Sequence, residues 1–150
     1  MPILGIDPGA NGGVGELWHM GEPPKAHAFS GKTLYDLWCL FNSFGQSSFP
    51  AKAYLEQVHA MPGQGVTSMF NFGRSYGHLE AMLTASGIPF ERVTPSKWQK
   101  EFGLYKQKGE TNTQKKNRHK ALAQELFPNI KITHAIADAL LIAEYGRRQQ

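Results

Sequence analysis

Three acidic residues, Asp7, Glu56 and Asp138, stand where the sequence pattern calls for apolar residues. Asp7 follows the apolar run "ILGI" at the end of a predicted strand, a usual place for functional groups in α/β sheets. Glu56 ends another predicted strand, in "YLEQ". Asp138 lies in "IADALL", within a predicted helix, where a buried carboxylate is costly unless it is paired or metal-bound. Singly, each acid has an ordinary explanation, as a turn residue, an exposed strand end or a solvated helix position.

Together, the three acids predict a metal site. Carboxylates that converge from separate elements repel one another unless cations lie between them. Two Mg²⁺ or Mn²⁺ ions about 3.5–4 Å apart can activate a water and stabilise a leaving oxygen in phosphodiester hydrolysis. We therefore expect two such ions at Asp7, Glu56 and Asp138. His134 precedes Asp138 by four residues on the same helix face, so it is a further candidate as metal ligand or general base, with an ordinary surface histidine as the alternative.

The positive charge of the chain is concentrated between residues 92 and 120. The formal net charge is +4, but this segment holds nine Lys and Arg against Glu101 and Glu110. Such a tract fits DNA or RNA, because each phosphate that is neutralised releases condensed counterions; a solvated helix face is the alternative. Small residues beside the acids are expected to let a nucleic-acid backbone approach the metals: Gly5, Gly9, Gly12, Gly13 and Ala139.

Length and composition favour one soluble domain over residues 1–150. The chain has 150 residues, 41% of them apolar, which is enough for a single core. No run is long and apolar enough to span a membrane, and no secretory signal is evident at the N-terminus, so no membrane partner is expected. Because Cys39 is the only cysteine, an internal disulfide is excluded.

Hydrophobic patterning predicts an α/β domain with a five-stranded mixed sheet flanked by helices. The first three strands form a meander, and the last two alternate with helices. Strands are expected over residues 2–7, 12–20, 25–30, 51–58 and 89–93. Helices are expected over residues 33–44, 67–86, 94–102 and 113–127, with a last helix from residue 133 that Gly146 ends.

Five segments resemble, in order, motifs of the RuvC-type Holliday junction resolvases, especially their compact phage branch. They are "GIDPGANGGVG", "YLEQVHAMPGQG", "FNFGRSYG", "VTPSKWQK" and "ADALLIAEYG", and they span nearly the whole chain. The resemblance implies an RNase H-like fold and a homodimer. It also implies symmetric, Mg²⁺- or Mn²⁺-dependent nicking of four-way DNA junctions, with 5′-phosphate and 3′-hydroxyl ends. The implied setting is DNA recombination and repair in the cytoplasm of a bacterial or phage-infected cell.

The same resemblance assigns roles to individual residues. Asp7, Glu56 and Asp138 match the metal-binding acids of the family, and Lys97 matches a basic residue beside the active site. Residues 61–65 correspond to the loop that probes the junction centre. The expected DNA contacts combine this loop, exposed aromatic and basic residues, and a second active-site lysine at 115 or 116: Met61, Gln64, Phe70, Arg74, Lys97, Lys100, Lys106, Lys108, Lys115, Lys116 and Arg118.

One position departs from the family pattern. A fourth active-site group, Asp or His, usually stands three residues before the last aspartate, where this chain has Ala135. Either His134, four residues before Asp138, takes that role, or Ala135 is an engineered replacement of an acid that inactivates the enzyme. In the second case the chain would bind junctions but cut them poorly.

Two other functions fit parts of the sequence. "GIDPGANGG" also resembles the phosphate loop of actin-like nucleotide kinases, but these need a second phosphate loop and a second lobe. No nucleotide cofactor is therefore expected. An RNase H that cuts RNA in hybrids shares the expected fold, and comparison of hybrid and junction substrates separates the two.

Overall fold

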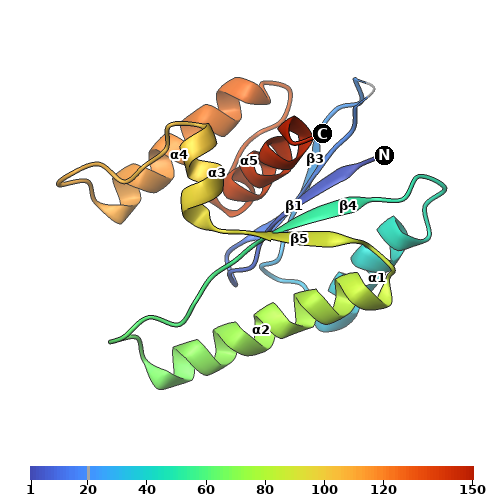
Figure 1. The fold of residues 1–150 in the computed structure, drawn as a ribbon, viewed down its shortest axis with the longest axis horizontal. Helices are drawn as coiled ribbons and strands as arrows, with labels where there is room; N and C mark the ends of the chain where they lie inside the picture. The colour runs from blue at the N-terminus through green and yellow to red at the C-terminus, as the bar shows by residue number, and fades with distance from the viewer. Residues whose placement is uncertain (20) are drawn as a thin grey trace.

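A mixed five-stranded sheet lies at the centre of the molecule (Figure 1). The computed structural model describes residues 1–19 and 21–150. Across these residues the strand order is β3-β2-β1-β4-β5, with β1 antiparallel to β2 and parallel to β4. The predicted mixed sheet is confirmed. The strands are β1 (Ile3–Asp7), β2 (Gly13–Leu17), β3 (Lys25–Ala28), β4 (Lys52–Glu56) and β5 (Phe90–Val93).

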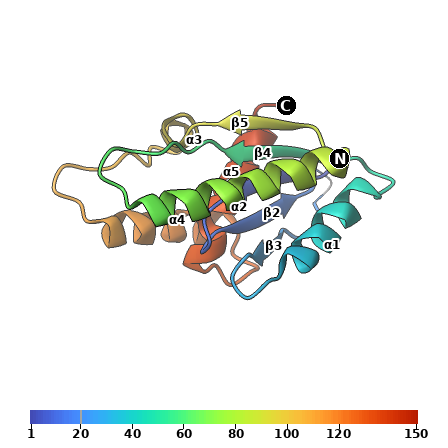
Figure 2. The ribbon, with the colours of Figure 1, turned by 90° about the horizontal axis from the view of Figure 1, so that it is seen from below.

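Helices cover both faces of this sheet. One face carries α1 (Leu34–Gly45) and α2 (Val66–Ala85). The opposite face carries α3 (Pro95–Glu101), α4 (Asn112–Leu126) and α5 (His134–Arg148), as the two views show (Figure 1; Figure 2). In the described part of the chain, no helix is both long and apolar enough to cross a membrane.

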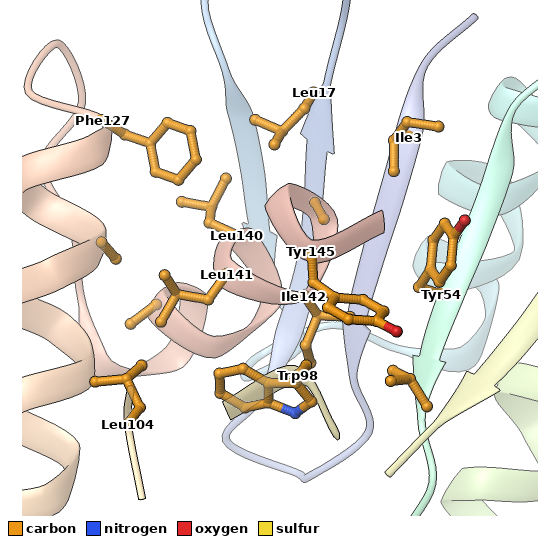
Figure 3. Packing of buried hydrophobic residues seen from close by; sticks show 14 of the residues in the cluster. Ile3, Leu17, Tyr54, Trp98, Leu104, Phe127, Leu140, Leu141, Ile142 and Tyr145 are labelled. Atoms are coloured by element: carbon orange, nitrogen blue, oxygen red, sulfur yellow. The ribbon is translucent and has the colours of Figure 1, made fainter. Parts of the chain in front are cut away.

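Side-chain alternation along the strands separates two cores and decides where the strand-end acids point. Ile3 and Tyr54 face α5, in a cluster that includes Trp98 and Leu140 (Figure 3). The residues next to them in sequence, such as Leu4 and Leu55, pack in the other cluster with α1 and α2. Because every second residue of a strand shares a face, Asp7 lies on the face of Ile3, and Glu56 on that of Tyr54. Both acids therefore point to the α5 side.

The backbone of helix α5 packs directly against β1 and β2, because each strand carries a glycine where the helix crosses it. A Cβ on Gly5 would clash with the backbone of Ala139 and Ala143, and a Cβ on Gly15 would lie 2.9 Å from the Cα of Leu140. The prediction that Gly5 and Ala139 make room for DNA is therefore wrong. These small residues make room for α5, which carries Asp138 to the end of β1.

The predicted ends of α5 and β2 differ from the structure. Helix α5 does not end at Gly146 but continues to Arg148. Gly146 is buried inside the helix, since a Cβ there would clash with the ring of Tyr54, so close packing rather than a helix cap explains this glycine. Strand β2 ends at Leu17; Met20, which the predicted strand included, lies outside the described residues.

The glycine at the β1–α5 crossing gives a stability test. Gly5→Ala should lower the free energy of unfolding by roughly 3 kcal/mol, because the new methyl group overpacks backbone that cannot move aside. The matched control is Gly77→Ala on α2, where nothing lies within 4 Å of the new Cβ; it should be neutral or stabilise by about 0.5–1 kcal/mol. Urea unfolding monitored by circular dichroism measures both. Equal stabilities for the two variants would contradict this packing.

Candidate active site

Three carboxylates meet where β1, β4 and α5 come together. The parallel register pairs Ile6 with Leu55, so the next residues, Asp7 and Glu56, stand side by side on adjacent strands. Asp138 comes from α5, which packs across β1. The charge of Asp138 acts on both strand-end acids. The structure thus brings together the three acids that the sequence singled out.

Each of these carboxylates has one oxygen held by one N–H donor. The backbone N–H of Gly9 donates to Asp7 Oδ1 at 3.3 Å. The indole Nε1 of Trp98 donates to Glu56 Oε1 at 2.9 Å. The Nδ1 of His119 lies 2.8 Å from Asp138 Oδ1. Within residues 1–19 and 21–150, the second oxygen of each acid has no hydrogen-bonded protein partner, so three oxygens are available to a ligand.

Burial and mutual repulsion favour the protonated forms of two of the acids. The pKa of Asp7 is raised to about 6, first by burial and then by the charge of Asp138. The pKa of Glu56 is raised to about 8, again first by burial and then by the charge of Asp7. Lys116 opposes the first shift and Lys115 the second. The two lysines therefore offset only part of the cost of ionising these acids.

This donor set fits a hard divalent cation. Mg²⁺ and Mn²⁺ prefer carboxylate oxygens, and Mg²⁺ is usually held by one or two of them together with waters. Among the described residues, no group of three or more His, Cys, Asp or Glu side chains is already arranged to hold a metal ion. Asp7, Glu56 and Asp138 are the side chains that could close on an ion.

Two clefts flank Asp138 and Lys116, which line both. The larger, the Asp7 cleft, has a volume of about 730 Å³. The smaller, the Glu56 cleft, has a volume of about 350 Å³. Besides Asp138 and Lys116, the Asp7 cleft is lined by the turn after β1, Thr113 and the start of α5, and the Glu56 cleft by Pro95, Gln99, Asn112, Lys115 and His119.

Several other residues proposed from the sequence lie at these clefts, whereas Lys97 does not. His134 and Ala135 line the Asp7 cleft; His134 is exposed, and Ala135 is half-buried. Lys116 lines the Asp7 cleft and Lys115 the Glu56 cleft, and their charges act to lower the pKa values of Asp7 and Glu56, respectively. Lys97 is exposed on α3 and lines neither cleft. Its role beside the active site stays a prediction.

The predicted DNA contacts outside the clefts are on exposed segments. Met61 and Gln64 belong to the loop before α2, where Gln64 Oε1 accepts a hydrogen bond from the backbone N–H of Met61. Phe70 and Arg74 are exposed on α2. The basic residues between α3 and α4 and at the end of α3 are exposed as well: Lys100, Lys106 and Lys108. All of these contacts remain predictions.

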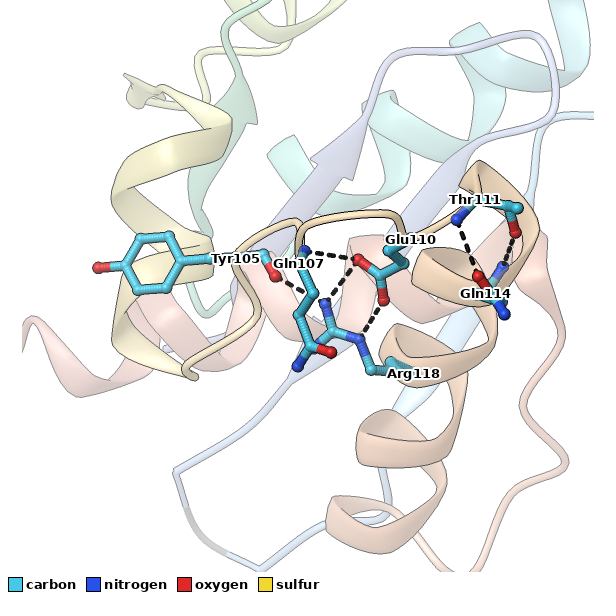
Figure 4. Close-up of polar contacts among 6 residues, drawn as sticks. All are labelled: Tyr105, Gln107, Glu110, Thr111, Gln114 and Arg118. Atoms are coloured by element: carbon cyan, nitrogen blue, oxygen red, sulfur yellow. Dashed lines mark hydrogen bonds and ion pairs between the residues drawn. The ribbon is translucent and has the colours of Figure 1, made fainter.

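Arg118 is engaged within the protein. Its guanidinium pairs with Glu110 and donates to the backbone carbonyl of Tyr105 at 2.7 Å, which ties the loop before α4 to that helix (Figure 4). The hydrogen bond from Arg118 lowers the pKa of Glu110 to about 2. Thr111 and Gln114 cap the helix next to this pair. A contact between Arg118 and DNA is untested, and the structure gives this side chain a role in shaping the loop.

The sequence did not predict that Trp98 and His119 form hydrogen bonds with the carboxylates of the site. Trp98 is buried in the core, and its indole donates a hydrogen bond to Glu56 that the sequence pattern did not indicate. His119 is buried on the inner side of α4 and was not singled out. It lies four residues before Ala123, a buried position, and this helical spacing could have marked it as an inward-facing polar residue.

The raised pKa values predict how the stability of the metal-free protein depends on pH. Asp7 and Glu56 both have folded pKa values above their ordinary values of 3.8 and 4.5. Between about pH 4 and pH 8 the folded protein therefore binds more protons than the unfolded chain, and the free energy of unfolding falls as pH rises. We expect a loss on the order of 2 kcal/mol from pH 5 to pH 8.5, about 5 °C in melting temperature.

Differential scanning fluorimetry in a chelating buffer measures this dependence. Asp7→Asn should melt above the parent at pH 8.5 and show a shallower pH dependence, because it removes one of the repelling charges. Glu125→Gln, an exposed charge change on α4, is the control and should follow the parent. A melting temperature that is constant or rises between pH 5 and pH 8.5 would show that the acids are not repelling one another.

Comparison with known proteins places this site in a known fold. No family model matches the chain. The chloroplastic Holliday junction resolvase MOC1 of Chlamydomonas reinhardtii is 33% identical over 99 residues, which cover 62% of this chain and 10% of that protein. The chain thus spans about a tenth of the length of this relative.

Two solved structures of Thermus thermophilus RuvC match the whole fold. Each match covers 99% of this chain and 96% of the RuvC chain. RuvC in one structure gives a TM-score of 0.57 at 15% identity, and RuvC in complex with a Holliday junction substrate gives 0.67 at 14% identity. These matches confirm the resemblance seen in the sequence: the chain has the RNase H-like fold of RuvC and is similar in sequence to a Holliday junction resolvase.

Proposed function

We propose that the chain is a divalent-metal-dependent endonuclease that resolves four-way DNA junctions by paired nicks. The observation that carries this proposal is the meeting of Asp7, Glu56 and Asp138 between two clefts, where each acid has one oxygen with no hydrogen-bonded partner among the described residues. The similarity to MOC1 and to a junction-bound RuvC supports the junction as substrate. The three acids lie within a single nuclease domain, residues 1–150.

The three acids would hold Mg²⁺ or Mn²⁺ through their free oxygens, with two ions per site. When bound, such ions lower the pKa of a water and stabilise charge on the phosphate and on the leaving oxygen. Asp7 would share ions with both other acids, because the charge of Asp138 raises the pKa of Asp7 and the charge of Asp7 raises the pKa of Glu56. Neutralisation of the three carboxylates would also remove the repulsion that raises the pKa of Asp7 and of Glu56.

The basic residues at the clefts would bind and orient the phosphate. Lys116 lines both clefts, and Lys115 lines the Glu56 cleft, so a phosphate beside the acids would meet an ammonium group on either side. Their charges would stabilise the extra negative charge of the transition state. His134, exposed at the rim of the Asp7 cleft, is placed to take a proton or add a ligand. Lys97, on α3, would contact the DNA backbone outside these clefts.

Paired, symmetric cuts need two active sites, so we propose a homodimer. The loop around Met61 and Gln64, with Phe70 at the start of α2, would contact the junction centre. Met61 and Phe70 are 66% and 68% exposed, which leaves both side chains accessible to DNA bases. The cytoplasm of a bacterial or phage-infected cell is the proposed setting.

Nicking of a synthetic four-way junction tests this function. With Mn²⁺ or Mg²⁺, the parent should cut opposed strands, and Asp7→Asn should reduce the rate about a thousandfold, because the acid between the two other carboxylates is lost. Glu125→Gln should retain the parent rate. Duplex DNA and an RNA–DNA hybrid are the comparison substrates, and strand-labelled junctions on a denaturing gel give the rates.

Two outcomes would contradict the proposal. If Asp7→Asn cuts the junction at the parent rate, the acids take no part in the reaction. A preference for the hybrid over the junction would favour an RNase H activity instead.

The same preparations should have a solution mass of twice 16.7 kDa by light scattering, and a monomer at micromolar concentration would exclude the dimer.

A non-catalytic junction-binding protein is the second candidate, and the position of Ala135 favours it. Ala135 lines the Asp7 cleft with Asp7 and Asp138, so a carboxylate there would face the same space. Its methyl group supplies no ligand. Loss of one ligand would weaken the binding of an ion at this site without changing the surrounding surface that would bind DNA.

Replacement of Ala135 decides between these candidates. If Ala135 impairs catalysis, Ala135→Asp should raise the nicking rate at least about tenfold and lower the Mn²⁺ concentration that is needed, because a fourth oxygen donor joins the site. Ala135→Asn has nearly the same size without the charge and is the control. A different result would assign the role of fourth active-site group to His134. In that case the parent cuts well, Ala135→Asp does not change the rate, and His134→Ala abolishes cutting.

A further inference from the structure

His119 is buried in a way that packing alone does not explain. It is 3% exposed, and its Nδ1 lies 2.8 Å from Asp138 Oδ1. Because an ionised carboxylate only accepts hydrogen bonds, Nδ1 carries the proton and donates. The other ring nitrogen, Nε2, is buried and has no hydrogen-bond partner among the described residues. An unpaired buried polar atom costs free energy, so an apolar residue of similar size would be more stable here.

Trp98 donates a hydrogen bond to Glu56, as His119 does to Asp138. Its side chain is fully buried, and its Nε1 donates to Glu56 Oε1 at 2.9 Å. The rings of Trp98 and His119 pack edge to face, with centroids 5.5 Å apart and planes at 75°. Trp98 comes from α3 and His119 from α4, so the two donors form one packed unit between these helices and the acids.

We propose that Trp98 and His119 are positioning residues that fix Glu56 and Asp138 for metal binding; this inference rests on the proposed function. Each donor holds one oxygen of its acid and leaves the second oxygen free. Since the two rings are in contact, they set the orientation of both carboxylates together. Outer hydrogen bonds of this kind orient ligands, and their loss typically lowers metal affinity 10–100-fold. Neither residue touches the metal or the DNA in this proposal.

Asparagine, glutamine and leucine at position 119 separate positioning from packing. An asparagine amide nitrogen falls near the place of Nδ1, whereas glutamine places its amide near Nε2, and leucine has no donor. His119→Asn should bind Mn²⁺ within about threefold of the parent, and His119→Gln and His119→Leu should bind about tenfold or more weakly. His119→Leu should also melt no lower than the parent, because it removes the unpaired Nε2. Isothermal titration with Mn²⁺ alone and thermal melting in chelator measure these effects.

The tryptophan is tested in the same way. Trp98→Phe keeps an aromatic ring in the core but loses the donor to Glu56, so Mn²⁺ affinity should fall about tenfold. Trp38→Phe on α1, whose side chain is 36% exposed, is the matched control and should bind as the parent does. Junction nicking at saturating Mn²⁺ should remain slower in His119→Leu and Trp98→Phe, since misoriented ligands are not corrected by more metal.

These measurements distinguish failure of the inference from failure of the proposed function. Parent Mn²⁺ affinity in His119→Leu, His119→Gln and Trp98→Phe would overturn the positioning role even if the parent cuts junctions. Weakened Mn²⁺ binding in these variants, with recovery in His119→Asn, would support the role even if the parent does not cut junctions. A parent chain that binds no Mn²⁺ would overturn both. If His119→Leu does not fold, the contrast between asparagine and glutamine decides.

Discussion

The close contact between α5 and the first two strands is the constraint on which the site depends. Gly5 and Gly15 leave no side chain at the crossing, so the backbone of α5 lies directly on β1 and β2. A helix at ordinary packing distance from the sheet would carry Asp138 away from Asp7. Ala139, Leu140 and Ala143 of α5 are buried at this contact. Backbone packing, more than any polar interaction, therefore assembles the three acids.

The assembled acids then oppose the folding that brings them together. Asp7 and Glu56 are half-buried, and both have raised pKa values because burial and neighbouring carboxylates disfavour their charged forms. Single hydrogen bonds from Gly9, Trp98 and His119 offset only part of this cost. A divalent cation would relieve the remainder, so in this account folding of the chain and binding of metal are thermodynamically linked.

The sequence allowed the fold and the three acids to be predicted, but not the interactions that support them. Strand ends follow from local apolar runs, and parallel strands ending at one edge bring Asp7 and Glu56 together. The role of Gly5 depends on Ala139 and Ala143 of α5, which lie far from it in the sequence, so the local pattern suggested DNA access instead. His119 reaches Asp138 only after α4 packs on α5. Likewise, which of Lys115 and Lys116 faces which acid is a property of how α4 is rotated, which short basic runs do not reveal.

A crystal structure with Mn²⁺, located by its anomalous scattering, tests the central claim most directly. Mn²⁺ should lie between Asp7 and the other two acids, coordinated by the carboxylate oxygens that Gly9, Trp98 and His119 do not hold. Those three hydrogen bonds should be retained in the metal-bound protein. Mn²⁺ bound elsewhere, with Asp7, Glu56 and Asp138 free of metal at saturating concentration, would contradict the account.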